Sequence, residues 1–331
     1  MKAVRISSLA LAAVFGLVTG ARAQFIESEP NDTKAAANNV FGIAAAGTIR
    51  GNTTGTSTTV PGAASADNFL VKTTAAGLGI YQYRMTLTTT GTAGHVGSLR
   101  GLTQTAGVPN AGTDSALQTS STATTPARFN QWYGFGKEEQ LYYRVTGTAT
   151  TTADYTATLS RTSVTAVNLG VFNPGTITIT TIGRGHTIDT DLWIYDGNFN
   201  AIAGYGSDDT IAANNGGTSS TQSYLSRTYA AGTYYMAMSN FNLANNQGSP
   251  VDDNYRSGGG VTDFANVVLN SSTTTNTNMA FAINGTQFAA AKPGAYDVYW
   301  GKFVVVPEPA SMFALATGIA ALASRRRRKN K

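Results

Sequence analysis

The chain of 331 residues contains no cysteine, only two histidines, and few charged side chains, which make up 12% of it. Without cysteine there is no disulfide, no thiol nucleophile, no cysteine-ligated metal and no covalently attached haem. His95 and His186 are too few for a histidine-rich metal site, and they give little basis for a Ser-His-Asp arrangement. The folded part must therefore be stabilised by hydrophobic burial or by bound ions.

No amphipathic helical repeat longer than a few residues stands out, whereas short stretches of alternation recur. Alternate residues are apolar from Tyr81 to Leu87 and from Leu141 to Val145. A period of two is typical of half-buried strands, and the abundant threonine favours the same conformation. The 36 glycines suit tight turns between short strands. The sequence therefore predicts an all-β fold.

The first 23 residues predict a secretory signal peptide. Lys2 and Arg5 form a basic start, an apolar stretch runs from residue 6 to residue 20, and Ala21-Arg22-Ala23 is a small-x-small cleavage site. This order is that of a signal helix which the secretion machinery removes, leaving Gln24 as the first residue. The secretion machinery is therefore an expected partner.

The last 27 residues, 305–331, are typical of a targeting segment. Pro307 and Pro309 flank Glu308 and end the preceding strand, because proline lacks an amide hydrogen and disfavours helix at the residue before it. The uncharged run 310–324 predicts a short hydrophobic helix of about 22 Å. That length is below a hydrocarbon core of about 30 Å, which favours transient insertion over permanent anchoring. A basic stop on the cytoplasmic side then follows, formed by Arg325, Arg326, Arg327 and Arg328.

The two terminal segments account for the basic character of the chain. The whole sequence carries a net charge of +5, but 14 Lys/Arg and 17 Asp/Glu lie between residues 24 and 306, a net charge of about −3. The body is therefore mildly acidic, and nucleic acid is not an expected partner.

The tail resembles the PEP-CTERM sorting signal of bacterial surface proteins. The resemblance rests on Pro307, Glu308 and Pro309, on the short apolar run, and on the arginines 325–328 at the end. It implies processing by a membrane enzyme of the exosortase type. It also implies an exported protein that is anchored in the membrane at least transiently and stays at the cell surface or is released into the extracellular matrix. An ordinary C-terminal membrane anchor is the alternative.

A second resemblance, to the bacterial pre-peptidase C-terminal (PPC) domain, covers most of residues 27–161. The matching segments, in order, are 27–33 (Glu-Ser-Glu-Pro-Asn-Asp-Thr), 47–49, 67–69, 142–147 and 155–159. That family is a compact β-sandwich with accessory roles in adhesion, substrate targeting or secretion. Independently of it, Asn31, Asp32 or Thr33 is expected to cap a short helical turn over the alanines that follow.

The second half resembles the same family in diverged form. Residues 189–196 read Asp-x-Asp-Leu-x-Ile-Tyr-Asp, and 208–209 and 231–235 read Asp-Asp and Ala-Gly-Thr-Tyr-Tyr. The resemblance implies two tandem β-sandwich domains, jelly-roll-like, at residues 24–161 and 162–304. The signal peptide, 1–23, precedes them and the sorting segment, 305–331, follows.

Carboxylates crowd the second half and form the candidate metal site. Asp189 and Asp191 are alternate residues, so they point to the same side of a strand, and Asp208 and Asp209 lie across a turn from them. Ca²⁺ takes six to eight oxygen ligands, so these four residues are the candidate calcium ligands. No calcium-loop motif is matched, and aspartate is an ordinary turn residue, so turns without any cofactor are the alternative. Spacing alone does not support reading these acids as a glycosidase pair.

Four aromatic residues mark the last strand. They belong either to the core or to an exposed strip that stacks on sugars, and core packing is favoured for Tyr296, Tyr299, Trp300 and Phe303.

Together these patterns predict a non-enzymatic structural or adhesive protein of the cell surface or extracellular matrix. Extracellular polysaccharide is the external partner to consider. A secreted hydrolase of polysaccharide or peptide, or an accessory to one, is the first alternative, although no nucleophile–base pair stands out. A calcium-dependent glycan-binding module is the second alternative.

Overall fold

The computed structural model describes residues 23–53, 65–89, 94–103, 118–119, 128–147, 153–241, 243–248, 250, 252, 264, 266–275, 277–292 and 294–307. These residues form 23 strands and two short 3-10 turns without any α-helix, so the predicted all-β class is confirmed. In this part of the chain no helix has the length and apolar character needed to cross a membrane. The predicted signal helix, the C-terminal helix, Glu308, Pro309 and Arg325–Arg328 lie outside the described residues.

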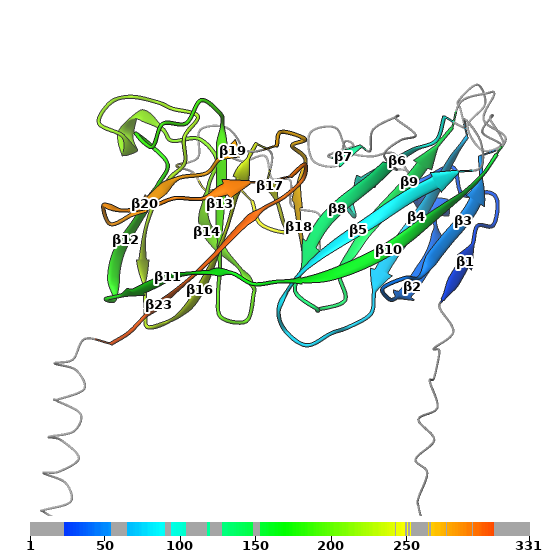
Figure 1. Ribbon diagram of the computed structural model, residues 1–331, viewed down its shortest axis with the longest axis horizontal. Coiled ribbons are helices and arrows are strands. Elements are labelled where there is room, and N and C mark those ends of the chain that lie inside the picture. The colour runs from blue at the N-terminus through cyan, green and yellow to red at the C-terminus, as the bar shows by residue number, and fades with distance from the viewer. Residues whose placement is uncertain are drawn as a thin grey trace, which may run out of the picture.

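The first sandwich packs a seven-stranded sheet against a five-stranded sheet (Figure 1). Its larger sheet has the order β1 (Gln24–Ile26), β3 (Thr48–Asn52), β10 (Asp154–Val164), β5 (Ile80–Thr89), β8 (Arg128–Gly134), β18 (Val267–Asn270) and β17 (Leu243–Ala244). Its smaller sheet has the order β2 (Asn38–Ile43), β4 (Ala66–Thr73), β9 (Gln140–Thr146), β6 (Val96–Arg100) and β7 (Gln118–Thr119).

One hydrophobic core fills the space between these two sheets. The side chains that enter it are the alternating ones that the sequence pattern predicts: Tyr83, Met85 and Leu87 from β5, and Leu141, Tyr143 and Val145 from β9. Because successive side chains of a strand point to opposite faces, this alternation sets which face of each sheet is buried.

The segment 27–33 is fastened to the start of β4. The backbone oxygen of Asn31 accepts hydrogen bonds from Asn68 N and Asn68 Nδ2, both at 3.0 Å, and Asp32 Oδ1 accepts one from Ala66 N at 3.1 Å. Thr33 Oγ1 accepts a hydrogen bond from Ala36 N at 3.3 Å and caps the 3-10 turn η1 (Lys34–Ala36). The predicted cap is therefore confirmed, and Thr33 is the residue that provides it.

The second sandwich packs a five-stranded sheet against a four-stranded sheet. The five-stranded sheet has the order β11 (Val167–Phe172), β23 (Tyr299–Val305), β16 (Gly232–Asn240), β13 (Thr190–Tyr195) and β14 (Ala201–Ser207). The four-stranded sheet has the order β15 (Tyr224–Tyr229), β12 (Gly175–Thr180), β20 (Phe281–Ile283) and β21 (Thr286–Phe288). A small sheet of β19 (Thr277–Asn278) and β22 (Ala291–Lys292) and the 3-10 turn η2 (Ala212–Asn214) complete this half.

The five-stranded sheet of the second sandwich is covered on both faces. In β13, Leu192 and Ile194 enter the core of the second sandwich, while Trp193 and Tyr195 face the first sandwich. In β23, Phe303 enters that same core and Trp300 faces the first sandwich. The aromatic residues of β23 are therefore packed in cores, with Phe303 and the half-buried Tyr299 in one and Trp300 in the other, and Tyr296, which precedes the strand, is also buried.

The surfaces that meet between the sandwiches form an aromatic joint, which we define by Tyr133 and Phe135 of the first sandwich and Tyr195, Phe199 and Trp300 of the second. Ring centroids are 5.1 Å apart for Phe135 with Tyr195 and with Phe199, and 5.8 Å apart for Tyr133 with Trp300. Aromatic pairs at these separations add to the free energy gained from burying their surface. The joint therefore holds the two sandwiches side by side along the long axis of the molecule (Figure 1).

One strand of the second half completes a sheet of the first. β18 pairs antiparallel with β8, with Val267 opposite Gly134 and Val268 opposite Tyr133. Residues 162–304 therefore supply two strands, β17 and β18, to the seven-stranded sheet of the first sandwich. The division of the body at residue 161 stays a prediction, as does the jelly-roll character of its halves.

Candidate functional site

Three of the four predicted metal ligands lie together at one end of β13. One carboxylate oxygen from each of Asp189, Asp191 and Asp208 lies within 4.8 Å of the other two. Asp191 and Asp208 are buried and Asp189 is half-buried. Strand pairing explains the approach, because Leu192 of β13 lies opposite Ser207 of β14, which places Asp191 and Asp208 next to each other at the end of the ladder.

Hydrogen bonds between segments far apart in sequence hold this end of β13. Leu243 N donates to Asp191 Oδ2 at 2.6 Å, and Phe241 N donates to the backbone oxygen of Asp189 at 3.3 Å. Thr190, between the two aspartates, is buried and bonds through its hydroxyl to Thr181 Oγ1 at 2.7 Å. These contacts attach the segment that contains Asp189 and Asp191 to residues 181, 241 and 243.

Asp209, the fourth predicted ligand, is buried beside this group but is not part of it. Both residues follow the end of β14 in a bend, and only Asp208 brings a carboxylate oxygen to Asp189 and Asp191. The carboxylates that could hold a hard cation such as Ca²⁺ are therefore Asp189, Asp191 and Asp208. Three carboxylates this close are costly to bury as anions unless a cation or protons compensate them.

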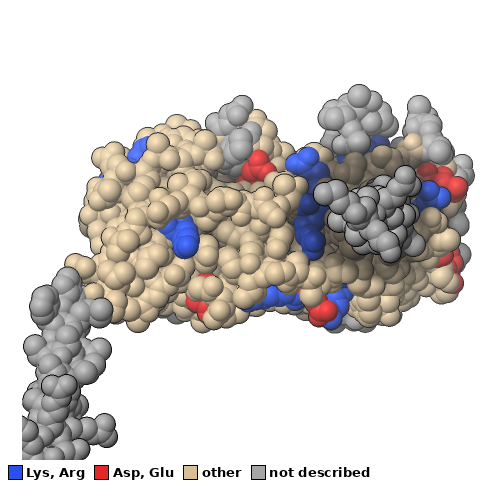
Figure 2. All heavy atoms as spheres, turned by 60° about the horizontal axis from the view of Figure 1, so that its bottom comes forward, with Lys and Arg blue, Asp and Glu red and all other residues tan. Residues whose placement is uncertain are grey.

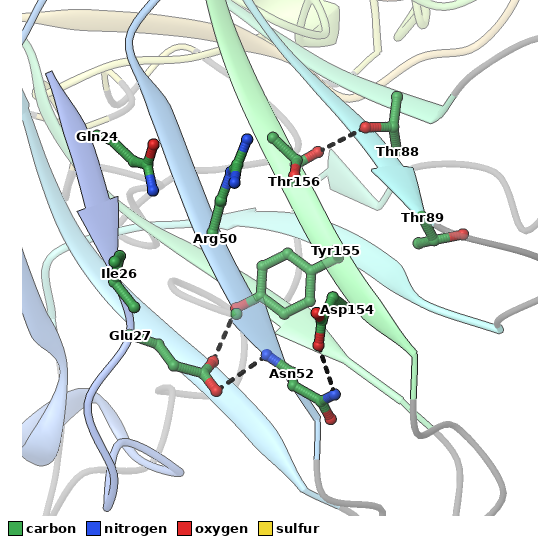
Figure 3. Close-up of a pocket in the computed structure, with 11 residues that line it drawn as sticks. Gln24, Ile26, Glu27, Arg50, Asn52, Thr88, Thr89, Asp154, Tyr155 and Thr156 are labelled. Atoms are coloured by element: carbon green, nitrogen blue, oxygen red, sulfur yellow. Dashed lines mark hydrogen bonds between the residues drawn. The ribbon is translucent and has the colours of Figure 1, made fainter. Parts of the chain in front are cut away.

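A second polar site opens at the far end of the first sandwich, where a groove of about 640 Å³ lies over β1, β3 and β10. Figure 3 shows Glu27 at its floor, where Oε1 accepts a hydrogen bond from Asn52 N at 2.9 Å and Oε2 accepts one from the hydroxyl of Tyr155 at 3.2 Å. Gly51 lines the same floor, and any side chain there would collide with Glu27 and Tyr155, so glycine is required for their contact.

Beneath this groove lies a buried carboxyl that sequence reasoning missed. Asp67 Oδ2 accepts a hydrogen bond from the Tyr155 hydroxyl at 2.6 Å, and its other oxygen has no hydrogen-bond partner among the described residues. Burial first, and then the neighbouring Glu27 carboxyl, raise the pKa of Asp67 to about 8. Burial first, and then the carboxyls of Asp67 and Glu27, raise the pKa of Tyr155 well above its usual range. In the sequence Asp67 is one polar residue in a strand, and only the fold places it beside Glu27.

The two histidines differ in burial, since His95 is enclosed by its neighbours and His186 is half-buried. His95 is fully buried, with Nε2 at 3.1 Å from Thr53 Oγ1 and its ring edge-on to Tyr155, and burial lowers its pKa to about 4. His186 has Nδ1 at 3.0 Å from the backbone oxygen of Asn278 and Nε2 against that of Ala280.

Glu139 is a second buried acid that the sequence pattern did not single out. Its Oε1 accepts hydrogen bonds from the backbone amides of residues 135, 136 and 137 at 2.7, 2.7 and 3.1 Å. Its Oε2 accepts from Thr73 Oγ1 at 2.5 Å and from the Tyr83 hydroxyl at 2.9 Å. Five donors around one carboxylate make it an anchor for the β8–β9 turn, with no lone pair left over for a ligand.

Comparison with known proteins identifies the tail. Residues 305–328 match the family of the PEP-CTERM protein-sorting motif. No curated protein matches the chain. The match covers the sorting segment alone, so the resemblance of residues 24–304 to the PPC domain stays a prediction. The motif begins inside the folded body, since Val305 is the last residue of β23 and is buried. The chain is thus an exported, cell-envelope-associated protein that carries a PEP-CTERM signal for sorting by exosortase.

Proposed function

We propose that the protein has a non-enzymatic structural or adhesive role at the cell surface or in the extracellular matrix. The observation that carries this proposal is the aromatic joint, which makes one long body out of two sandwiches. An elongated body of this kind, delivered by a sorting tail, suits a spacer or a surface component that presents its far end to the surroundings. The sorting signal supports the location, and the joint supports the role.

Two features support a role without catalysis. The Thr53–His95 pair has a hydroxyl next to an imidazole, but both residues are fully buried, so a substrate does not reach them. The ring nitrogens of His186 are engaged by two backbone carbonyls. A hydrolase would need a nucleophile and base that face an open site.

A deletion strain of the native host tests this proposal. We expect loss of the gene to reduce surface attachment or matrix retention, and the wild-type gene to restore it. Trp300→Ala, which weakens the joint, should restore less than Phe41→Ala, a change at an exposed aromatic residue. Unchanged attachment and matrix in the deletion strain, together with hydrolysis of polysaccharide or peptide by the purified full chain, would instead favour the hydrolase.

Polysaccharide is the partner that the groove in Figure 3 suits best. The groove is open and is lined by hydrogen-bonding side chains that include Arg50, Asn52 and Asp154. The Tyr155 ring is buried, so recognition there would depend on hydrogen bonds and not on stacking. Binding of the full chain to a glycan array, lowered by Arg50→Ala, would support adhesion, and no binding to any glycan would favour a purely structural role.

A calcium-dependent module is the second candidate, favoured by the close approach of Asp189, Asp191 and Asp208. If Ca²⁺ binds the folded state alone, a concentration 100 times the dissociation constant stabilises it by about 2.7 kcal/mol. Thermal melting of the full chain in Ca²⁺ should therefore exceed that in EDTA by several degrees. Equal melting temperatures in the two buffers would rule the calcium site out.

A further inference from the structure

The described part of the body exposes several large apolar side chains on the side from which the sorting tail leaves. We call this surface the apolar underside and define it by Leu78, Val167, Val171 and Val306, which are 60%, 52%, 62% and 37% exposed. Leu78 belongs to the β4–β5 connection of the first sandwich, and Val167 and Val171 belong to β11 of the second. These segments and the end of β23 lie along the lower side of the molecule in Figure 1.

A groove of about 700 Å³ between the two sandwiches joins these residues into one surface. Leu78 and Val171 both line it, as does Val304 of β23. Val306 lies two residues after Val304, and its N–H donates to the backbone oxygen of Phe172 at 3.0 Å, beside Val171. The four exposed residues therefore share one face of the body, although they come from three segments.

The apolar underside carries almost no charge. The segments 73–83, 162–183 and 303–307, which supply its four apolar residues, contain no Asp, Glu, Lys or Arg. Among the described residues that line the groove, Lys302 alone is charged. The carboxylate nearest in sequence to the groove is that of Asp196, which hydrogen bonds from Asn198 and Asn200 retain within its own turn. Figure 2, which brings the lower side forward, shows mostly uncharged surface with scattered basic and acidic groups over the second sandwich.

The short connection to the tail brings this surface close to the membrane. Val305 is the last strand residue, and the uncharged run begins at Ala310. Five residues reach at most about 18 Å when fully extended. The interfacial layer on each side of a bilayer takes up about 5–8 Å of that distance. With the tail inserted, the end of β23 therefore lies at most about 10–13 Å from the lipid headgroups.

We propose that the apolar underside rests on the surface of the bilayer that holds the tail, with Leu78 and Val171 at the level of the headgroups and Lys302 facing anionic lipid. This inference rests on the proposed display of the tail in the membrane. Apolar side chains flanked by a basic group are the combination that binds such a surface. Docking sets the height at which Pro307 and the two residues after it are presented to the processing enzyme.

A second copy of the chain fits this surface less well than lipid does. Pairing through the edge strand β11 would need an uninterrupted ladder, but the register shifts between Asn168 and Val171 and Gly170 has a φ of +100°. Bulges of this kind protect edge strands from pairing. The groove is also concave, and Leu78 reaches it from the other sandwich.

The absence of cysteine makes the test direct. Single variants Leu78→Cys and Val171→Cys of the full chain, labelled with a fluorophore and placed in phosphatidylglycerol-containing vesicles, are exposed to lipids that carry a nitroxide at the headgroup. Ser219→Cys, at an exposed residue between η2 and β15, is the matched control, and the segment that joins these two elements lies at the upper left in Figure 1. We expect at least twofold more quenching at positions 78 and 171 than at position 219. Val171→Asp should lower quenching at position 78, and Ser219→Asp should leave it unchanged.

Alkaline extraction of the same vesicles reports separately on the tail. If the labels are not quenched and the chain resists extraction, the docking proposal is wrong, although the tail is inserted in the membrane. Unquenched labels on a chain that is extracted overturn both. Quenching that needs host membranes containing the processing enzyme, and is absent from pure lipid, would assign the surface to a protein partner instead. If the labels are also shielded in detergent, and the molecular mass measured there is that of two chains, the surface would be assigned to a second copy.

Discussion

Each sandwich buries carboxylates, and the two groups are stabilised in different ways. In the first sandwich Glu139 is surrounded by five hydrogen-bond donors, three of them backbone amides of the turn that it closes. In the second, one carboxylate oxygen from each of Asp189, Asp191 and Asp208 lies within 4.8 Å of the other two, although Asp191 also accepts a hydrogen bond from Leu243 N. A carboxylate surrounded by donors is part of the scaffold, whereas three carboxylates that converge are candidates to hold a cation. Burial of a carboxylate therefore does not by itself identify a binding site, because the groups around the carboxylate determine whether it is already satisfied.

Of the substitutions that test this comparison, Glu139→Ala should cause the largest loss of stability. It leaves three amides and two hydroxyls around a cavity, and each unsatisfied buried group costs about 1–3 kcal/mol. We expect a loss on the order of 5 kcal/mol in the free energy of unfolding, measured by urea denaturation. Glu138→Gln is the control, since the Lys72–Glu138 ion pair at 2.8 Å is exposed and such pairs contribute about 0–1 kcal/mol. Equal losses in the two variants would show that Glu139 is not an anchor.

Trp300→Ala should come next, because it removes the central ring of the aromatic joint. Truncation of a buried Trp costs about 3–5 kcal/mol. We also expect the calorimetric transition to split into two, one for each sandwich, so that the two carboxylate groups can be assigned to separate unfolding steps. A single transition with unchanged width in this variant would mean that the sandwiches are coupled by other contacts, such as the pairing of β18 with β8.

Asp67→Asn should change how stability depends on pH. The pKa of Asp67 is about 8 in the folded protein and about 4 when unfolded, so the folded state binds the extra proton between these values. Its contribution is complete below about pH 4 and is lost as the pH rises toward 8, at up to about 1.4 kcal/mol per unit. The pKa of His95 is about 4 in the folded protein and about 6.5 when unfolded. Below pH 6.5 the unfolded state therefore binds the extra proton, and His95 lowers the stability of the folded state as the pH falls.

The clean window for this measurement is therefore pH 6.5 to 8. There the wild type should lose stability as the pH rises, and Asp67→Asn should show a flatter profile in denaturant titrations. His95→Gln serves as the control, since it should change the profile below pH 6.5 and leave the upper window unchanged. A wild-type profile that is already flat between pH 6.5 and 8 would contradict the raised pKa of Asp67.

Asp208→Asn should have the smallest effect on the chelated protein and the clearest effect on its response to calcium. Removing one of three converging charges relieves repulsion, so we expect a gain of about 1 kcal/mol in EDTA. The same variant should lose the stabilisation by Ca²⁺ that the wild type shows in thermal melts. Asp154→Asn, an exposed residue bonded to Asn52, is the matched control and should keep the wild-type response.

Local sequence patterns predicted a large part of this structure. The alternation from Tyr81 to Leu87 and from Leu141 to Val145 predicted strands whose alternate residues are buried, and these form the core of the first sandwich. Alternate aspartates at 189 and 191, with Asp208 and Asp209 across a turn, predicted a group of four carboxylates, and the structure brings three of them together. Binding of calcium by this group stays a prediction. The strands and the approach of the three carboxylates follow from local pattern, because the period of a strand and the reach of a turn depend on neighbouring residues.

Other features depended on residues that are distant in sequence. Asp67 meets Glu27 and Tyr155 because β4 and β10 belong to opposite sheets of one sandwich. β18 pairs with β8 although more than 130 residues separate them in the sequence, and the four residues of β18 carry no pattern that predicts this partner strand. The second face of the sheet that contains Trp193 and Trp300 could have met solvent, and the first sandwich covers it instead.

The sequence by itself determined the destination of the protein and its class of fold. The sorting motif is a linear signal that is read in order along the chain, and the all-β class follows from strand periodicity, so neither needs tertiary contacts. Only the tertiary structure decided which acids are anchors and which converge, and that the two sandwiches share an aromatic joint. Those outcomes depend on strand register and sheet packing, which arise from the summed burial of many side chains and not from any single segment.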